Sequence, residues 1–325
     1  MRTAARLGVF GLGLAAAFTG AWGVGQAIGE PPPEPVAEHD EDPGHPEPAL
    51  DHDDDGSAVT DDHGQDAPTT DGTDAGGHAA HGAAAPPGGL QISQDGYTFH
   101  LVDTPTTAGT EATLAFHIIG PDGHPVTQFD IEHEKRLHLI VANRSLTEFQ
   151  HVHPEMADDG LWTLPITLDA GGAYRAFADF SPSGGDPLTL GADLLVLGSA
   201  NPGPMPAEAP TSTVDGYEVS LDGRMASGEE DTLSFTVTRD GSPVELEPYL
   251  GAYGHLVVLR AGDLAYLHAH PHGDEPQPGQ TGGPSVGFAT TAPSIGTYRL
   301  FLDFQVDGVV HTASFTVDVG TGHDH

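Results

Sequence analysis

The chain has 325 residues, of which 48 are acidic and 10 basic, so its formal net charge is −38. Such a chain repels nucleic acid and anionic lipid and attracts cations. It contains no cysteine, which excludes disulfides and thiolate metal sites. Its 44 glycines and 28 prolines favour short strands joined by turns.

The first segment, residues 1–29, begins with Arg2 and Arg6 and continues as an uncharged, mostly apolar run. This pattern is typical of an export signal peptide or of an uncleaved N-terminal membrane anchor. The two arginines hold the N-terminus in the cytoplasm. We therefore expect an exported protein that is either anchored to the outer face of the cytoplasmic membrane or secreted.

Residues 30–89 are rich in Pro, Asp and His and contain almost no large apolar side chain. A segment of this composition cannot bury enough apolar surface to offset the entropy lost on ordering, so we expect a disordered acidic linker. Its six histidines allow two interpretations, a solvated spacer and a weak, many-sited binder of metal ions.

The rest of the chain is an internal duplication. Residues 90–198 and 210–320 form two modules, which a proline-rich linker, 199–209, separates, and a His-containing tail, 321–325, ends the chain. Within the modules, Tyr-Arg-Ala-Phe-Ala-Asp-Phe in the first matches Tyr-Arg-Leu-Phe-Leu-Asp-Phe in the second.

Each module contains short apolar or alternating runs separated by Asp-Gly, Pro-Gly and Gly-Gly pairs. Alternation with period two predicts half-buried strands, and these pairs predict the turns between them. No sustained helical period is present. The predicted fold class is therefore all-β: two tandem immunoglobulin-like antiparallel β-sandwich modules after the membrane segment and the disordered linker.

Both modules carry the same histidine pattern, in which twelve residues separate one histidine from a His-x-His pair that a proline follows. The two triplets are His138, His151 and His153, and His255, His268 and His270. Residues i and i+2 of a strand point to one face, with Cβ atoms roughly 6 to 7 Å apart. The twelve-residue gap fits a hairpin or a neighbouring-strand return, either of which would bring the third imidazole alongside the pair.

Three neutral imidazoles suit a divalent transition metal, and copper ranks ahead of zinc at most nitrogen and oxygen sites. Asp179 and Asp303 occupy matching positions in otherwise apolar strands, so each needs a partner. That partner is the metal, a ligand imidazole, or an arginine or backbone amide. His133 lies near the first triplet but has no match in the second module. Half-buried structural histidines are the alternative interpretation.

Three segments of the first module, Lys135-Arg-Leu-His-Leu-Ile-Val, Phe149-Gln-His-Val-His-Pro and Tyr174-Arg-Ala-Phe-Ala-Asp-Phe, carry a family resemblance. The chain resembles secreted bacterial proteins of the heavy-metal-binding, YtkA-like group, which in turn are similar to the CopC group of copper-resistance sandwiches. The resemblance covers both modules. It implies an immunoglobulin-like fold and the handling of copper or a related metal outside the cytoplasm.

The sequence therefore predicts a non-enzymatic protein that binds a divalent transition metal in each module, for sequestration or homeostasis. Its expected partners are metal ions and, through the N-terminal segment, a membrane; no nucleic-acid partner is expected. Two alternatives stay open. One is a structural or adhesion-type tandem sandwich with core or pH-sensing histidines. The other is a metal-dependent oxidoreductase that uses an open coordination position.

Overall fold

The computed structural model describes residues 86–200, 203–277 and 279–321. The predicted N-terminal segment, residues 30–85 of the predicted linker, and residues 322–325 of the tail lie outside the described residues. Every regular element of the described part is a β-strand, which confirms the predicted all-β class. The described residues include no helix that is long and apolar enough to span a membrane.

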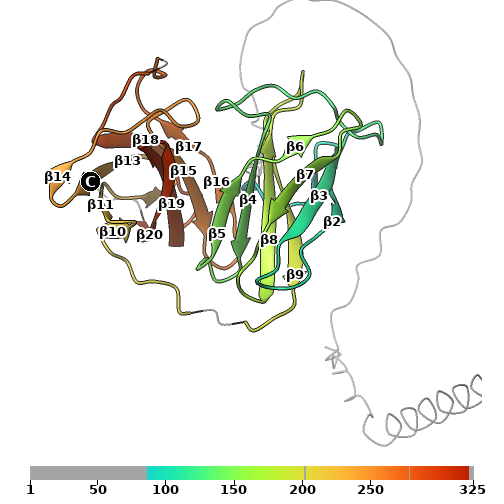
Figure 1. Cartoon of the computed structure of the whole chain (residues 1–325), viewed down its shortest axis with the longest axis horizontal. Helices are drawn as coiled ribbons and strands as arrows, with labels where there is room; N and C mark the ends of the chain where they lie inside the picture. Colours follow the sequence, from blue (N-terminus) through green and yellow to red (C-terminus); the bar gives the residue numbers. More distant parts are fainter. Residues whose placement is uncertain (1–85, 201–202, 278, 322–325) are drawn as a thin grey trace, which may run out of the picture. The chain divides into compact units, whose positions relative to one another are not determined.

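The first module is a sandwich of two antiparallel sheets (Figure 1). One has the order β1-β2-β3-β7-β6 and the other β5-β4-β8-β9. The strands are β1 (Ser93–Gln94), β2 (Tyr97–Asp103), β3 (Ala112–Ile119), β4 (Leu137–Asn143), β5 (Phe149–Val152), β6 (Glu155–Met156), β7 (Trp162–Ile166), β8 (Gly172–Phe180) and β9 (Leu188–Val196).

The second module repeats this plan with sheets β10-β11-β13-β18-β17 and β12-β20-β19-β15-β16, while β14 pairs with β13. Only the short β12–β20 pair among its named strands is parallel. The strands are β10 (Thr211–Val214), β11 (Tyr217–Asp222), β12 (Ala226–Ser227), β13 (Glu230–Arg239), β14 (Ser242–Pro243), β15 (His255–Arg260), β16 (Tyr266–Leu267), β17 (Ala269–Pro271), β18 (Ser285–Thr291), β19 (Gly296–Val306) and β20 (Val309–Thr321).

Local chemistry explains the tight connections. Asp307 and Gly308 join β19 to β20 with φ angles of 53° and 72°, the left-handed conformation that two-residue hairpin turns require. Each module also contains a tyrosine that anchors a strand to the preceding loop. The Tyr174 hydroxyl donates to the Ala170 carbonyl, and the Tyr298 hydroxyl to the Ser294 carbonyl, both at 2.9 Å. This tyrosine corner is typical of immunoglobulin-like sandwiches.

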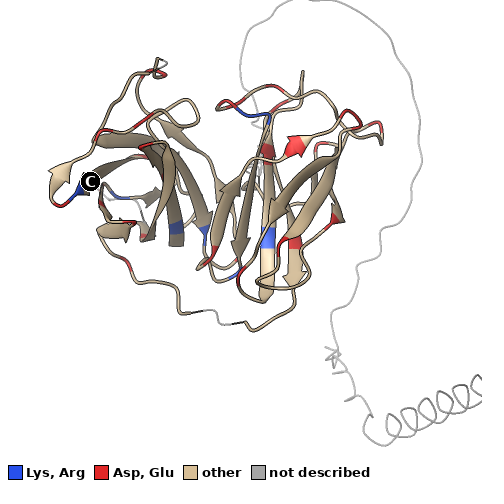
Figure 2. Cartoon of the chain, in the orientation of Figure 1, with Lys and Arg blue, Asp and Glu red and all other residues tan. Residues whose placement is uncertain are grey.

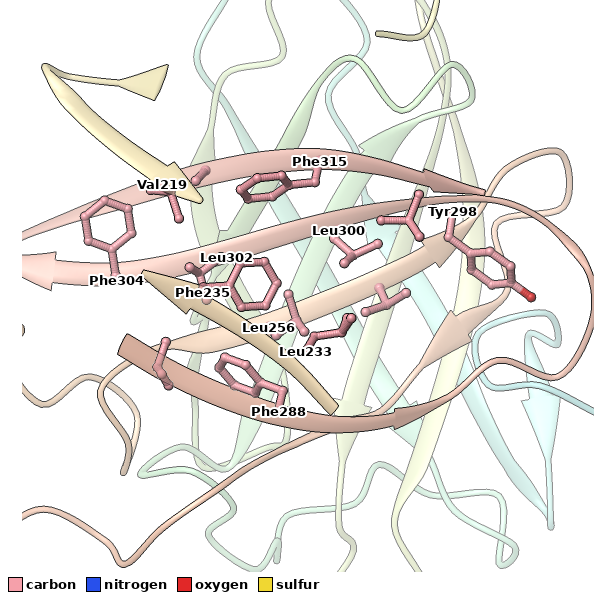
Figure 3. Close-up of a cluster of buried hydrophobic side chains, with 14 of the residues drawn as sticks. Val219, Leu233, Phe235, Leu256, Phe288, Tyr298, Leu300, Leu302, Phe304 and Phe315 are labelled. Carbon is pink, nitrogen blue, oxygen red and sulfur yellow. The ribbon is translucent and has the colours of Figure 1, made fainter. Parts of the chain in front are cut away.

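Each module has its own apolar core between its two sheets. In the second module, Phe235 and Phe288 of one sheet face Leu300 and Phe315 of the other (Figure 3). Alternation along the strands produces this core, because β13 buries Leu233, Phe235 and Val237 and leaves the residues between them more exposed. The modules therefore do not depend on each other for a hydrophobic interior.

A third apolar cluster joins the two modules, which fall in one compact unit of the chain. Strand β4 is buried along its whole length because one face packs in the first core while Ile140 and Ala142 pack in the shared cluster. The Phe149 and Phe301 rings stack across the cluster, with centroids 3.9 Å apart. The Arg299 side chain adds a hydrogen bond to the Leu146 carbonyl. The wholly apolar central strands thus reflect burial on both faces.

Charged side chains are sparse in the sheets and lie mainly in loops and at strand ends, where acidic residues outnumber basic ones (Figure 2). The single lysine, Lys135, lies in the loop before β4.

Replacing Phe301 by alanine should destabilise the protein by about 3 kcal/mol, since it removes a stacked, buried ring from the shared cluster. Urea unfolding of the full chain measures this loss. Leu195→Ala is the control because Leu195 is 72% exposed and should change stability by less than about 0.5 kcal/mol. Equal effects of the two substitutions would contradict the shared cluster.

Candidate metal centre

The β4–β5 hairpin assembles the first histidine triplet. The strands pair with Ile140 opposite His151, so His151 and His153 return alongside His138. The His138 Nδ1 atom lies 3.0 Å from His151 Nε2 and 3.2 Å from His153 Nε2. One nitrogen from each ring falls within 4.8 Å of the other two. The three imidazoles therefore converge on one point.

Hydrogen bonds on the outer side of the rings determine which nitrogens carry hydrogen. The second nitrogen of His138, Nε2, lies 3.1 Å from the Glu132 carbonyl, which can only accept. Likewise His151 Nδ1 lies 2.7 Å from Asp303 Oδ2. Both outer nitrogens therefore donate, which leaves His138 Nδ1 and His151 Nε2 as bare lone pairs when the rings are neutral.

These two lone pairs face each other at 3.0 Å. No hydrogen bond joins two acceptors, so the contact is unfavourable without a positive charge between them. A neutral His153 can donate its single N–H to His138 Nδ1, but it then has no second N–H to donate to His151 Nε2. A positive charge between the two nitrogens, on a proton or on a metal ion, would remove this repulsion.

Burial keeps two of the imidazoles neutral. Loss of solvent, and next the neighbouring His151, lowers the pKa of both His138 and His153 to about 3. An unperturbed histidine is protonated below about pH 6.5. In the folded protein, His138 and His153 stay neutral well below that pH, because desolvation disfavours the imidazolium form.

The second module completes the centre. Asp303 belongs to β19, and it is buried together with His151, whose side chain is only 1% exposed. The Thr312 hydroxyl donates to the other Asp303 oxygen. His255 packs its ring on His138, with centroids 5.3 Å apart and planes 8° from parallel. Asp303 therefore positions a histidine of the other module, and the centre spans both.

The second triplet does not converge in the same way. In the first module β5 stays paired with β4 as far as Val152. In the second, β16 leaves β15 after Leu267, and Ala269–Pro271 pairs with β18 of the other sheet. His268 and His270 lie at this crossover, their ring centroids 6.2 Å apart, and His255 lies against the first triplet instead. The expectation of two equivalent triplets therefore needs correction.

Asp179 repeats the arrangement of Asp303, with a threonine of the neighbouring strand on one side and a histidine of the other module on the other, but its histidine lies farther away. Its Oδ1 atom accepts from Thr189 at 2.8 Å and lies 3.5 Å from His268 Nε2, a residue of the other module. Burial raises the pKa of Asp179, although the charges of His268 and His133 act against this rise. Each carboxylate thus faces a histidine of the opposite module.

The loop before β4 places another histidine, His133, beside the centre, although His133 has no match in the second module. His133 and Glu134 occupy the middle of a turn that two hydrogen bonds between Glu132 and Lys135 close. Their φ angles are 47° and 65°, which non-glycine residues rarely adopt. The His133 ring lies 5.5 Å from His255 and 6.1 Å from His138, between ring centroids. The positive φ angle of His133 is a property of the folded backbone, and the sequence pattern does not reveal it.

Lowering the pH should destabilise the metal-free protein. Between pH 6.5 and about 3, His138 is protonated in the unfolded chain but neutral in the folded one, so the unfolded state binds more protons and stability is lost. One such group contributes about 1.4 kcal/mol per pH unit. Urea unfolding with a chelator at pH 7, 6, 5 and 4 should show a shallower pH slope for His138→Gln.

His100→Gln is the control for that slope, because His100 is exposed on β2. Asp179 contributes with the opposite sign, since its pKa is raised, and all three proteins keep it. Identical slopes for the parent and His138→Gln would show that His138 is not held neutral.

The solved structures that match this chain share little sequence with it. A DUF4426 family protein from Pseudomonas aeruginosa PAO1 is 10% identical, with a TM-score of 0.25 over 35% of this chain and 95% of that one. Invasin, a bacterial integrin-binding protein, is 13% identical, with a TM-score of 0.22 over 70% of this chain and 39% of its own. This chain thus spans less than half of invasin.

A putative membrane anchored protein from Corynebacterium diphtheriae is 9% identical, with a TM-score of 0.22 over 71% of this chain and 60% of that one. No curated protein shows significant similarity. The model of the family described as "Domain of unknown function (DUF8832)" matches residues 92–194 and 212–321, the two sandwiches. Because these ranges make up more than half of the sequence, the chain belongs to the DUF8832 family.

Proposed function

We propose that this protein binds a divalent transition-metal ion, copper ahead of zinc, between His138, His151 and His153. The observation that carries the proposal is the 3.0 Å contact between His138 Nδ1 and His151 Nε2, whose outer hydrogen bonds leave both as acceptors. A metal ion between them turns this repulsion into two coordinate bonds.

The spacing of the nitrogens supports a single ion. Imidazole nitrogens bind zinc at about 2.0 to 2.1 Å, so two ligands of one ion lie roughly 2.9 Å apart at a right angle and 3.4 Å apart in a tetrahedron. The two short contacts of His138 Nδ1, at 3.0 and 3.2 Å, fall inside that range. The triad needs little rearrangement to receive the ion.

Asp303 supports the same interpretation. A carboxylate that accepts the outer N–H of a ligand histidine fixes its ring and strengthens it as a ligand. The His151–Asp303 contact at 2.7 Å has this form, and the Thr312 hydroxyl holds the carboxylate in turn. Neutral nitrogen ligands without thiolate favour copper(II) over zinc at equilibrium.

The ligand set suits storage or capture of the ion rather than catalysis. The first site lies among side chains that are mostly buried, which limits the access of a substrate to the ion. A role outside the cytoplasm fits the predicted N-terminal segment, which would export the modules and either anchor or release them. The resemblance to heavy-metal-binding, YtkA-like proteins points the same way.

A proton is the competing occupant. Protonated at Nε2, His151 would pair with Asp303 and donate to His138 Nδ1, which satisfies the same contacts. This form would make the centre a pH-responsive link between the modules. Imidazole ¹⁵N NMR of the chelated protein at neutral pH distinguishes a protonated His151 from a neutral one.

Removing the triad should abolish one tight metal site. In competition with a chelator that suppresses weak binding, the full chain should hold one more copper(II) or zinc(II) ion than the His151→Ala, His153→Ala double variant. The control is His100→Ala with His124→Ala, two exposed histidines away from the centre, which should lose no tight ion. Equal tight stoichiometry in all three proteins would overturn the proposal.

Asp303→Asn should weaken the tight site by about 10- to 100-fold, because an asparagine oxygen is a poorer acceptor for the His151 N–H. A chelator competition titration measures the change. Asp215→Asn is the control: Asp215 accepts from His311 at 2.8 Å in a second carboxylate–histidine pair, which lies outside the centre and whose carboxylate is more exposed. If both substitutions act alike, Asp303 has no special link to the metal.

A further inference from the structure

A cavity of about 280 Å³ adjoins the triad on the side of the second module. Its volume has room for an ion and several waters, since one water occupies about 30 Å³ of liquid. His138, a member of the triad, also lines this cavity. The cavity wall includes the following potential ligands outside the triad: His133, Asp179, His255, His268 and His270.

The contact between Asp179 and His268 has the length of a ligand pair. The 3.5 Å between Asp179 Oδ1 and His268 Nε2 is too long for a charge-assisted hydrogen bond, which measures about 2.7 to 2.9 Å. It matches the separation of roughly 3.4 Å between two ligands that share one tetrahedral ion. Thr189 already donates to that carboxylate oxygen at 2.8 Å and fixes its position.

His255, which also lines the cavity, supplies a neutral imidazole. Burial, and next the nearby His151, lowers its pKa well below the usual range. Its ring centroid lies 5.5 Å from that of His133, a spacing close to the 4.9 to 5.3 Å found within the triad.

The backbone at Glu134 carries strain that its counterpart in the second module, Gly251, avoids, whereas His133 shares its positive φ angle with Leu250. The same closed turn occurs in the second module between Tyr249 and Ala252, where Leu250 and Gly251 hold φ angles of 57° and 78°. The first module has Glu134 in place of Gly251, although a non-glycine residue there costs about 1 to 2 kcal/mol. Strain of this kind is concentrated at functional sites. The turn directs His133 to the cavity wall.

We infer that this cavity is a second binding site for a divalent transition-metal ion, with His133, His255, His268 and Asp179 as its ligands. The mixed set of imidazoles and one carboxylate suits zinc(II) or copper(II). Two ligands come from each module. None of the four belongs to the triad, so the inference stands or fails separately from the proposed function.

This site should be the weaker of the two. Its ligands must close around the ion, whereas the triad nitrogens already lie within 4.8 Å of one another. Lys135 and Arg136 also line the cavity, and their positive charges oppose a cation. The triad should therefore fill first, and the cavity only at higher metal concentration.

The test uses zinc(II) and the full chain carrying His151→Ala and His153→Ala, which lacks the triad. Long-range ¹H–¹⁵N spectra report each imidazole separately, so histidines elsewhere in the chain do not obscure the result. Zinc should shift the ring nitrogens of His133, His255 and His268 together, along one binding curve. Adding His133→Leu should weaken that curve at His255 and His268 at least tenfold.

Leucine is a safe replacement because Leu250 occupies the equivalent turn position in the second module. Asp179→Asn should weaken the curve similarly, whereas His100→Ala should leave it unchanged. The inference is wrong if His255 and His268 do not shift under saturating zinc, or if they shift identically with and without His133. Loss of triad binding in the parent protein would not affect either outcome.

Discussion

The central strand of each inner sheet, β4 or β15, is covered on both faces, and this double burial governs the rest of the structure. A polar group on such a strand has no access to bulk water, so it must find its partner inside the protein. His138 of β4 stacks on His255 of the opposite module, and Asp303 of the neighbouring buried strand β19 contacts His151 of the opposite module. The chemistry of the chain is concentrated at the module interface because the interface is where buried polar residues can satisfy each other.

Much of this could be predicted from sequence because the responsible interactions are local. The twelve-residue spacing predicted a hairpin or a neighbouring-strand return, and β4 and β5 pair across it as a hairpin. The Asp-Gly pairs predicted left-handed turns, and positive φ at Asp95, Asp215 and Asp307 bears this out. The duplication predicted two sandwiches, and both cores follow the alternation of apolar residues.

The parts that sequence could not supply depend on contacts between distant segments. The wholly apolar character of β4 and β15 indicated burial but did not identify what covers the second face. Asp303 lies 152 residues from His151, and no local pattern links them. In the second module, Tyr266 and Leu267 pair with β15, whereas Ala269–Pro271 pair with β18 of the other sheet. Identical histidine spacing therefore produced one compact triad and one dispersed set.

The crossed carboxylate contacts have an evolutionary consequence. Asp303 faces His151, and Asp179 faces His268, so the two modules meet through equivalent surfaces, as the subunits of a symmetric dimer do. In a dimer of identical subunits, one mutation alters both halves of such an interface at once. In a fused pair each half mutates independently. One half of the interface can then keep a tightly closed centre while the other half opens into a cavity, and the fold of each module stays the same.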